Sequence, residues 1–194
     1  MQTELDLVST FANTARAAEA HVSVTTNDAE ARTCVADILR REGAQLVMVS
    51  PGAAAPPWSI GAETTGGARA VTRSPARSDR DELLAAGAGI TVAAHAIADI
   101  GTLVLCASDG DHRLDSLVPP VHIALLRASA IVPDLEVAFA RFAADRRFER
   151  HSAVTFVRGP SRTADIELQI TIGVHGPRAL HIVVLDDRGQ AAAG

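Results

Sequence analysis

Short apolar runs of strand length alternate with amphipathic helical patterns along this chain. The mostly apolar runs at residues 45–49, 121–126 and 180–185 are typical of strands buried in a parallel sheet. Between such runs, apolar residues recur at helical spacing, which predicts helices at residues 4–20 and 133–144. This alternation is typical of a layered α/β domain, and we expect a mostly parallel sheet with helices packed against it.

The sequence also marks the two ends of a further helix. Asn27 is a predicted N-cap with Glu30 three residues on, as in a capping box, and Gly43 is a predicted C-cap.

By contrast, residues 51–67 are rich in proline and glycine, so we expect a loop outside the core. In the helix at residues 133–144, the spacing predicts four inward side chains: Leu135, Ala138, Phe139 and Phe142.

Composition limits the classes of function. The 194 residues are 47% apolar and 21% charged, which is usual for a globular protein and predicts one domain over residues 1–186 with a flexible tail at residues 187–194. The net charge of −5 and the aromatic content of 3% argue against a protein that binds nucleic acid. No apolar stretch is long enough for a membrane span, and the N-terminus lacks the features of a signal peptide. Because only Cys34 and Cys106 are present, this chain alone cannot supply a four-thiolate zinc or iron–sulfur site, and two free thiols favour a cytoplasmic location.

The most informative polar segment is residues 156–167, where a strand is expected to end at Gly159. We expect a helix to begin at Ser161, so that its free backbone N–H groups and the nearby Arg162 bind a phosphate or a carboxylate. The alternative is a well-capped helix start with an arginine–aspartate pair on the surface. From Ser161 onward, the polar residues of the segment are Ser161, Arg162, Thr163, Asp165 and Glu167.

Two further segments carry candidates for proton transfer. His175 is bracketed by glycines and a proline; it would be a general acid or base, or a hydrogen-bond donor to a substrate, because imidazole titrates near neutral pH. Asp99 would be a base or the partner of an arginine, and Thr102 offers a hydroxyl to a ligand. The alternatives are a turn in which His175 hydrogen-bonds the backbone, and an ordinary Asx-type turn that leads into a strand.

A fourth segment precedes the strand at residues 121–126. Arg113 and Ser116 would together hold a carboxylate or a phosphate, and the alternative is an ordinary polar loop. His122 alternates with apolar neighbours in the strand, so we interpret it as a core histidine.

Several familiar motifs are missing from the sequence. It contains neither of the glycine-rich nucleotide-binding loops and neither the zinc-protease nor the nucleophile-elbow motif. The seven histidines have no metal-ligand spacing, so we expect no metal from sequence motifs. One arrangement stays open, in which Asp99, Asp165, Glu167 and a histidine meet in space around a metal.

Taken in order, the polar segments resemble the LutC/YkgG family of LUD-domain proteins, which is known from lactate-utilisation operons. The resemblance is strongest over residues 85–186 and is otherwise one of general layout. It is carried by Gly89-Ile90-Thr91, Ala96-Ile97-Ala98-Asp99-Ile100-Gly101-Thr102, Arg113, the run from Ser116 to His122, Val132-Pro133, the run from Gly159 to Glu167, the run from Gly173 to Pro177, and Leu180-His181. Where the family usually has a Glu-Thr pair, this chain has Asp99 and Ile100, which shortens the acid by one methylene and removes a hydroxyl.

The resemblance implies a fold similar to the NagB/RpiA/CoA-transferase superfamily, which is a Rossmann-like layered α/β structure. It also implies a part in the oxidation of L-lactate to pyruvate, together with two partner proteins that carry iron–sulfur clusters, and no cofactor on this chain. A shared fold does not by itself establish a shared function.

We therefore hypothesise a subunit of a lactate-utilisation system that binds a small anionic ligand. Arg162 and the N–H groups after Gly159 would hold the anion, with Arg113 and Ser116 as a second contact and Asp99 with His175 as an acid/base pair. The alternative is a non-catalytic interaction or regulatory subunit that stabilises the iron–sulfur partners. A third reading is a sugar-phosphate isomerase or a CoA transferase, for which Glu167 is the only glutamate in the motif segments.

Overall fold

A computed structural model of the 194-residue chain shows a layered α/β architecture. The structure describes residues 4–72, 80–107, 113–144, 151–164, 170–172 and 176–188. Within these ranges, every helix is too short or too polar to cross a lipid bilayer.

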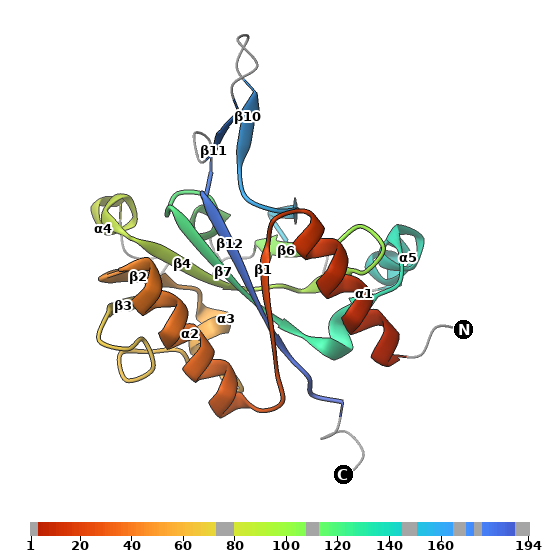
Figure 1. The fold of residues 1–194 in the computed structure, drawn as a ribbon, viewed down its shortest axis with the longest axis horizontal. Helices are drawn as coiled ribbons and strands as arrows, with labels where there is room; N and C mark the ends of the chain where they lie inside the picture. The colour runs from red at the N-terminus through yellow and green to blue at the C-terminus, as the bar shows by residue number, and fades with distance from the viewer. Residues whose placement is uncertain are drawn as a thin grey trace.

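A six-stranded, fully parallel sheet forms the centre of the molecule, in the strand order β1-β12-β7-β4-β2-β3 (Figure 1). Its strands are β1 (His21–Thr25), β2 (Leu46–Val49), β3 (Arg69–Thr72), β4 (Ala88–Val92), β7 (Val121–Arg127) and β12 (Ala179–Leu185). The parallel α/β architecture expected from the alternating pattern is confirmed: the strands pair in parallel, and the central β7 and β12 are mostly apolar and buried on both faces.

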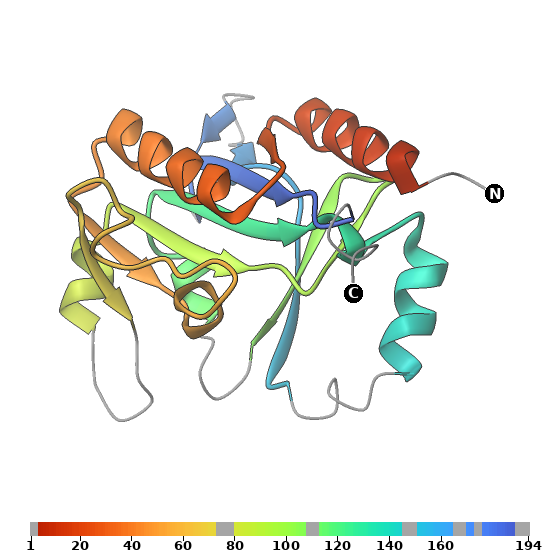
Figure 2. The ribbon, with the colours of Figure 1, turned by 90° about the horizontal axis from the view of Figure 1, so that it is seen from below.

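A second sheet, in the order β8-β5-β6-β9, packs against one side of the first (Figure 2). It consists of β5 (His95–Ile97), β6 (Thr102–Ala107), β8 (Ile131–Val132) and β9 (Ala153–Val157). The central strand β6 runs antiparallel to both of its neighbours, β5 and β9. A separate antiparallel pair, β10 (Arg162–Ala164) with β11 (Ile170–Ile172), projects away from both sheets (Figure 1).

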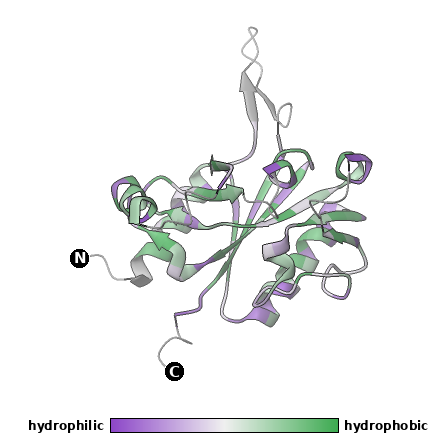
Figure 3. Ribbon diagram, turned by 180° about the vertical axis from the view of Figure 1, so that it is seen from behind, coloured by the Kyte–Doolittle hydropathy of each residue, from purple (hydrophilic) through white to green (hydrophobic). Residues whose placement is uncertain are grey.

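Two apolar cores lie on opposite faces of the central sheet, because alternate residues of one strand belong to different cores. In β12, for example, Leu180 and Ile182 pack beneath helix α1 (Glu4–Ala17), whereas Val183 packs beneath helix α2 (Asp28–Glu42). Figure 3 shows hydrophobic residues along the strands of the main sheet and a mixture of hydrophilic and hydrophobic residues along the helices. The first core also takes in the inner side of the second sheet, through residues such as Leu103 of β6.

The ends predicted for α2 are confirmed. The side chain of Asn27 accepts a hydrogen bond from the N–H of Glu30, as an N-cap does. Gly43 has a φ of 68°, the left-handed conformation in which glycine commonly ends a helix. The Glu30 carboxylate reaches back to the N–H of Thr26, one residue before the N-cap.

Two local expectations were wrong. Residues 51–67 are not outside the core: they contain helix α3 (Pro51–Ala54), and Trp58 is only 3% exposed in the core beneath α2. In α5 (Leu135–Ala144), Ala138 faces inward, but Leu135 and Phe139 are 42% and 54% exposed. The second sheet is small, so the helix that follows it buries a narrower face than the apolar pattern implied. The described residues also include helix α4 (Arg80–Ala85) and a short 3-10 helix, η2 (Ala128–Ala130).

Candidate functional site

The candidate site is built around a single turn of 3-10 helix, η1 (Arg113–Ser116), that lies directly on strand β4. It can approach so closely because position 89 is a glycine: a Cβ atom there would meet the backbone of Asp115. The contact buries Asp115 and Ser116 and leaves Arg113 on the exposed side of the turn.

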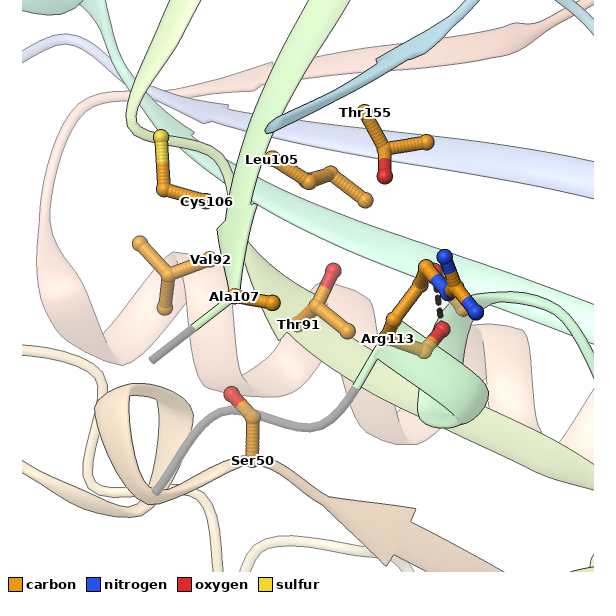
Figure 4. Close-up of a pocket in the computed structure, with 9 residues that line it drawn as sticks. Ser50, Thr91, Val92, Leu105, Cys106, Ala107, Arg113 and Thr155 are labelled. Carbon is orange, nitrogen blue, oxygen red and sulfur yellow. Dashed lines mark hydrogen bonds between the residues drawn. The ribbon is translucent and has the colours of Figure 1, made fainter. Parts of the chain in front are cut away.

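Beside η1 lies a recess that takes four hydroxyl groups from four different segments (Figure 4). Ser50 follows the end of β2, Thr91 lies near the end of β4, Ser116 ends η1, and Thr155 lies in β9. The recess has a volume of about 20 Å³, and its apolar wall consists of Val92, Leu105 and Ala107 together with Cys106. It lies at the carboxyl ends of β2 and β4, which is where open parallel sheets bind ligands.

Arg113 supplies the positive charge of the recess. Among the residues that the structure describes, its guanidinium forms no ion pair, so its donors remain available to a ligand. The Ser116 hydroxyl donates a hydrogen bond of 2.8 Å to the carbonyl of Arg113, which ties the two ends of η1 together (Figure 4).

A larger hollow of about 480 Å³ adjoins the recess and shares Ser116 and Thr155 with it. The stretches Gly159–Ser161 and Gly176–Pro177 form part of its wall. They are held together by a hydrogen bond of 2.9 Å from the Ser161 N–H to the Pro177 carbonyl. A Cβ atom at Gly176 would lie 3.2 Å from that of Ser161, so this approach is tight. Arg158 and His122 also line the hollow.

His122 is 1% exposed, which agrees with its interpretation as a core histidine. Burial lowers the pKa of His122 to about 4, because the charged imidazolium would lose its hydration, so the ring is neutral near pH 7. Its Nε2 atom lies 2.8 Å from the hydroxyl of Thr91, which connects His122 to the recess.

The structure brings three of the predicted site residues together and keeps two apart from them. Arg113 and Ser116 line the recess, and Ser116 and Ser161 line the adjoining hollow. Thr102 is buried at the start of β6, the opposite end from the residues that line the recess, and its hydroxyl donates to the carbonyl of Ile100. Asp99 is exposed in a turn that lines neither hollow.

The helix predicted to begin at Ser161 is absent from the described residues. Arg162 and Thr163 lie in β10, which pairs with β11, so the backbone there is extended and offers no helical cluster of N–H groups. The side chains of Arg162 and Thr163, and the whole of Asp165 and His175, lie outside the described residues.

The segment around Asp99 has a packing role. Gly101 and Gly159, with φ of 61° and 71°, lie against the C-terminal end of helix α1. A Cβ atom at Gly101 would meet the backbone of Ala15, and one at Gly159 would meet that of Ala18, the first residue after the helix. In addition, the Thr14 hydroxyl donates a hydrogen bond of 2.6 Å to the carbonyl of Ala98. These two glycines therefore position α1 against the second sheet.

Sequence reasoning missed three contributors to the recess: Ser50, Thr91 and Thr155. Ser50 and Thr91 carried an available signal, because each lies at or near the carboxyl end of a predicted parallel strand. Thr155 lies in the middle of β9, and only the packing of the second sheet brings it to this place.

Within the described ranges, no group of three or more histidine, cysteine and carboxylate side chains is arranged to hold a metal ion. What the site offers chemically is one cation and the hydroxyl groups of Ser50, Thr91 and Thr155 around a small recess, because the Ser116 hydroxyl already donates its hydrogen to the Arg113 carbonyl.

Comparison with known proteins identifies the family to which this architecture belongs. A family model described as the LUD domain matches residues 8–185, nearly the whole chain. The chain belongs to the LUD domain family. A solved structure of a DUF162 family protein from Deinococcus radiodurans superposes with a TM-score of 0.73, with 25% identity over 95% of this chain and 99% of that one.

This LUD-domain chain is also similar to curated proteins named lactate utilization protein C. The protein from an Exiguobacterium species is 37% identical over 116 residues, which cover 59% of this chain and 50% of the relative. The protein from Halalkalibacterium halodurans is 40% identical over 103 residues, which cover 50% of this chain and 44% of the relative. The chain spans about half the length of the curated relatives it matches.

Proposed function

We propose that this LUD domain takes part in lactate utilisation by binding a small carboxylate anion in the recess beside η1. The names of its relatives support the process. The observation that carries the binding proposal is the placement of Arg113, a cation without an ion pair in the described residues, in one recess with the hydroxyls of Ser50 and Thr91, which lie at or near the carboxyl ends of β2 and β4. The hydroxyl of Thr155 lines the same recess from β9.

The chemistry of a carboxylate matches this arrangement. Its two oxygens accept hydrogen bonds from the paired N–H groups of an arginine and from hydroxyl donors. The recess of about 20 Å³ has room for roughly one water-sized group, which suits a carboxylate head rather than a whole molecule. The rest of the ligand would extend past Ser116 into the larger hollow.

The oxidation step belongs, in this proposal, to partner proteins that hold iron–sulfur clusters. This chain has only Cys34 and Cys106, too few thiolates for a four-cysteine cluster site. It would contribute substrate or product binding, and neither Asp99 nor His175 is assigned a role in it.

The test is calorimetric titration of the purified chain with L-lactate and with pyruvate. Substitution Arg113→Ala should weaken binding at least tenfold, because a charged hydrogen bond is worth roughly 1.5–3 kcal/mol. Arg141→Ala, which removes an exposed arginine on α5, is the matched control and should leave the affinity within twofold. Equal affinities for the wild type and Arg113→Ala, or no binding to the wild type, would reject the proposal.

A second candidate function, an interaction subunit without a ligand, is favoured by an exposed aromatic cluster. Phe139 of α5 and Phe156 of β9 are 54% and 44% exposed, and both contact the ring of Phe142. Leu135, four residues before Phe139 in α5, and Val154, two residues before Phe156 in β9, lie on the same faces of their elements and are 42% and 40% exposed. Such a patch is typical of a protein–protein contact.

Co-purification with the iron–sulfur partners separates the two functions. If the chain is an interaction subunit, Phe139→Ser should abolish the complex. Leu84→Ser, which changes a similarly exposed apolar side chain on α4, should leave the complex intact. If the complex still oxidises lactate when it carries Arg113→Ala, the interaction function is favoured over ligand binding.

A further inference from the structure

The contact between His122 and Thr91 joins a buried ring to the ligand recess. In the parallel pair β4–β7, Gly89 is the residue in register with His122, and Thr91 lies two positions further along. The His122 ring therefore reaches diagonally across the strands, and its Nε2 atom comes within 2.8 Å of the Thr91 hydroxyl. Thr91 is 8% exposed and lines the recess with Arg113.

The hydrogen-bond partners of the two ring nitrogens differ. Nε2 has the hydroxyl of Thr91, whereas Nδ1 is buried without a hydrogen-bond partner among the described residues. A neutral imidazole carries one N–H, on one nitrogen or the other. A buried N–H group without an acceptor is rarer in proteins than an under-used acceptor, so the hydrogen is favoured on Nε2, where the hydroxyl oxygen accepts it.

This tautomer fixes the direction of the hydroxyl. If Nε2–H donates to the Thr91 oxygen, the hydrogen of Thr91 cannot return to the ring and is left for another acceptor. Thr91 makes no other side-chain hydrogen bond within the described part of the chain. In the opposite tautomer, the hydroxyl would donate to the ring and turn lone pairs toward the recess, which would repel an anion.

Resting on the proposed function, we propose that His122 is a positioning residue that holds the Thr91 hydroxyl as a hydrogen-bond donor toward the carboxylate of the ligand. His122 does not touch the carboxylate in this arrangement; it acts through Thr91. Because the neutral ring is the form that burial favours, this orientation persists over the physiological pH range.

A Thr91 hydroxyl held as a donor also narrows the class of ligand that the recess can bind. With Arg113 and Thr91 both acting as donors, the recess suits a group that only accepts hydrogen bonds. A carboxylate meets this requirement, whereas the NH₂ of a carboxamide would place its own donor against them. The site should therefore discriminate L-lactate from lactamide, and loss of the His122 ring should reduce that discrimination.

One test of the tautomer needs no substitution. In the wild-type chain, ¹⁵N-detected spectra of the histidine rings should show His122 with a proton on Nε2 and none on Nδ1. A protonated Nδ1 would overturn the inference, whatever the chain binds. Assignment uses loss of the signal in His122→Gln.

The second test is a set of affinities for L-lactate by calorimetry. His122→Leu should bind about tenfold more weakly, because the hydroxyl is no longer held as a donor to a charged acceptor. His122→Gln, whose amide N–H can replace Nε2–H, should bind within about threefold of the wild type. In the Thr91→Val background, His122→Leu should have no additional effect, because the two residues act as one unit.

The outcomes separate this inference from the proposed function. If wild type binds and Arg113→Ala does not, but His122→Leu binds as well as wild type, the positioning role is rejected and the carboxylate site stands. If His122→Leu lowers thermal stability without changing affinity, its role is structural, which also rejects the inference. If His122→Leu does not fold, the wild-type ring spectrum and the His122→Gln affinity decide the inference. Absence of any lactate binding by wild type would reject both proposals.

Discussion

Gly89 lies directly beneath Asp115: a Cβ atom at position 89 would fall 1.8 Å from the carbonyl oxygen of Asp115. No contact between backbone and side chain can be that short, so either η1 or β4 would have to move. The recess exists because a strand and a helical turn meet at a residue without a side chain.

The substitution Gly89→Ala should therefore displace η1 and reduce the free energy of unfolding by about 3 kcal/mol, the upper part of the usual range for overpacking. Thermal denaturation measures the loss, and lactate titration should show weakened binding as Arg113 shifts. Gly61→Ala is the matched control, because nothing lies within 4 Å of a Cβ there. A Gly89→Ala protein as stable as Gly61→Ala would contradict the packing argument.

Gly101 and Gly159 allow a different prediction, which concerns α1. Cβ atoms would lie 2.4 Å from the N atom of Ala15 and 2.1 Å from the carbonyl oxygen of Ala18, so alanine at either position should loosen the helix. Hydrogen exchange of the α1 amides should accelerate more than that of the α2 amides.

The control for these two variants separates backbone strain from the clash. Gly43 also has a positive φ, 68°, but nothing lies within 4 Å of the place where a Cβ atom would be. Gly43→Ala should lose only the roughly 1–2 kcal/mol of a left-handed residue. If Gly101→Ala loses no more than Gly43→Ala, contact with α1 is not what requires the glycine.

Burial of His122 makes stability depend on pH. Its pKa is about 4 in the folded protein and 6.5 when the chain is unfolded, so between these values the unfolded state binds more protons. Stability should therefore fall as pH is lowered from 6.5 toward 4, by up to about 3 kcal/mol from this residue. Urea denaturation across this range should show the fall in wild type and a flatter profile in His122→Gln. Identical profiles would contradict a buried, neutral ring.

A second histidine is tuned by its neighbours. Burial lowers the pKa of His181, and the Glu42 carboxylate, 3.0 Å from Nε2, partly offsets this by raising it, while His21 and Arg41 lower it. The pKa of His181 should fall further in Glu42→Gln and rise in Arg41→Ala, as followed by NMR titration of the ring. Arg141→Ala should leave it unchanged, and a rise in Glu42→Gln would contradict the assigned charges.

Local signals in the sequence predicted the regular parts of the fold. The caps of α2 at Asn27 and Gly43 and the continuous apolar strands β7 and β12 follow from capping chemistry and from burial on both faces. Strands β5 and β8 have three and two residues, too few for any periodicity to emerge. Trp58 is buried although its surroundings are rich in proline, because tertiary packing overrode the loop composition.

The site was only partly predictable for a related reason. Arg113 and Ser116 were found because both lie in one short polar segment. Ser50 and Thr155 are more than 100 residues apart and meet only through the packing of two sheets. At Ser161, the capping signal pointed to a helix, but residues 162–164 pair as β10 with the nearby strand β11. A strand of three residues is too short to show periodicity, so nothing in the local spacing opposed the capping signal.

A crystal structure of this chain grown with saturating L-lactate or pyruvate tests the central claim most directly. We expect the carboxylate beside η1, with its oxygens within hydrogen-bond distance of the Arg113 guanidinium and the Thr91 hydroxyl. A ligand bound elsewhere, or a recess occupied only by water in crystals that contain the ligand at saturation, would contradict it.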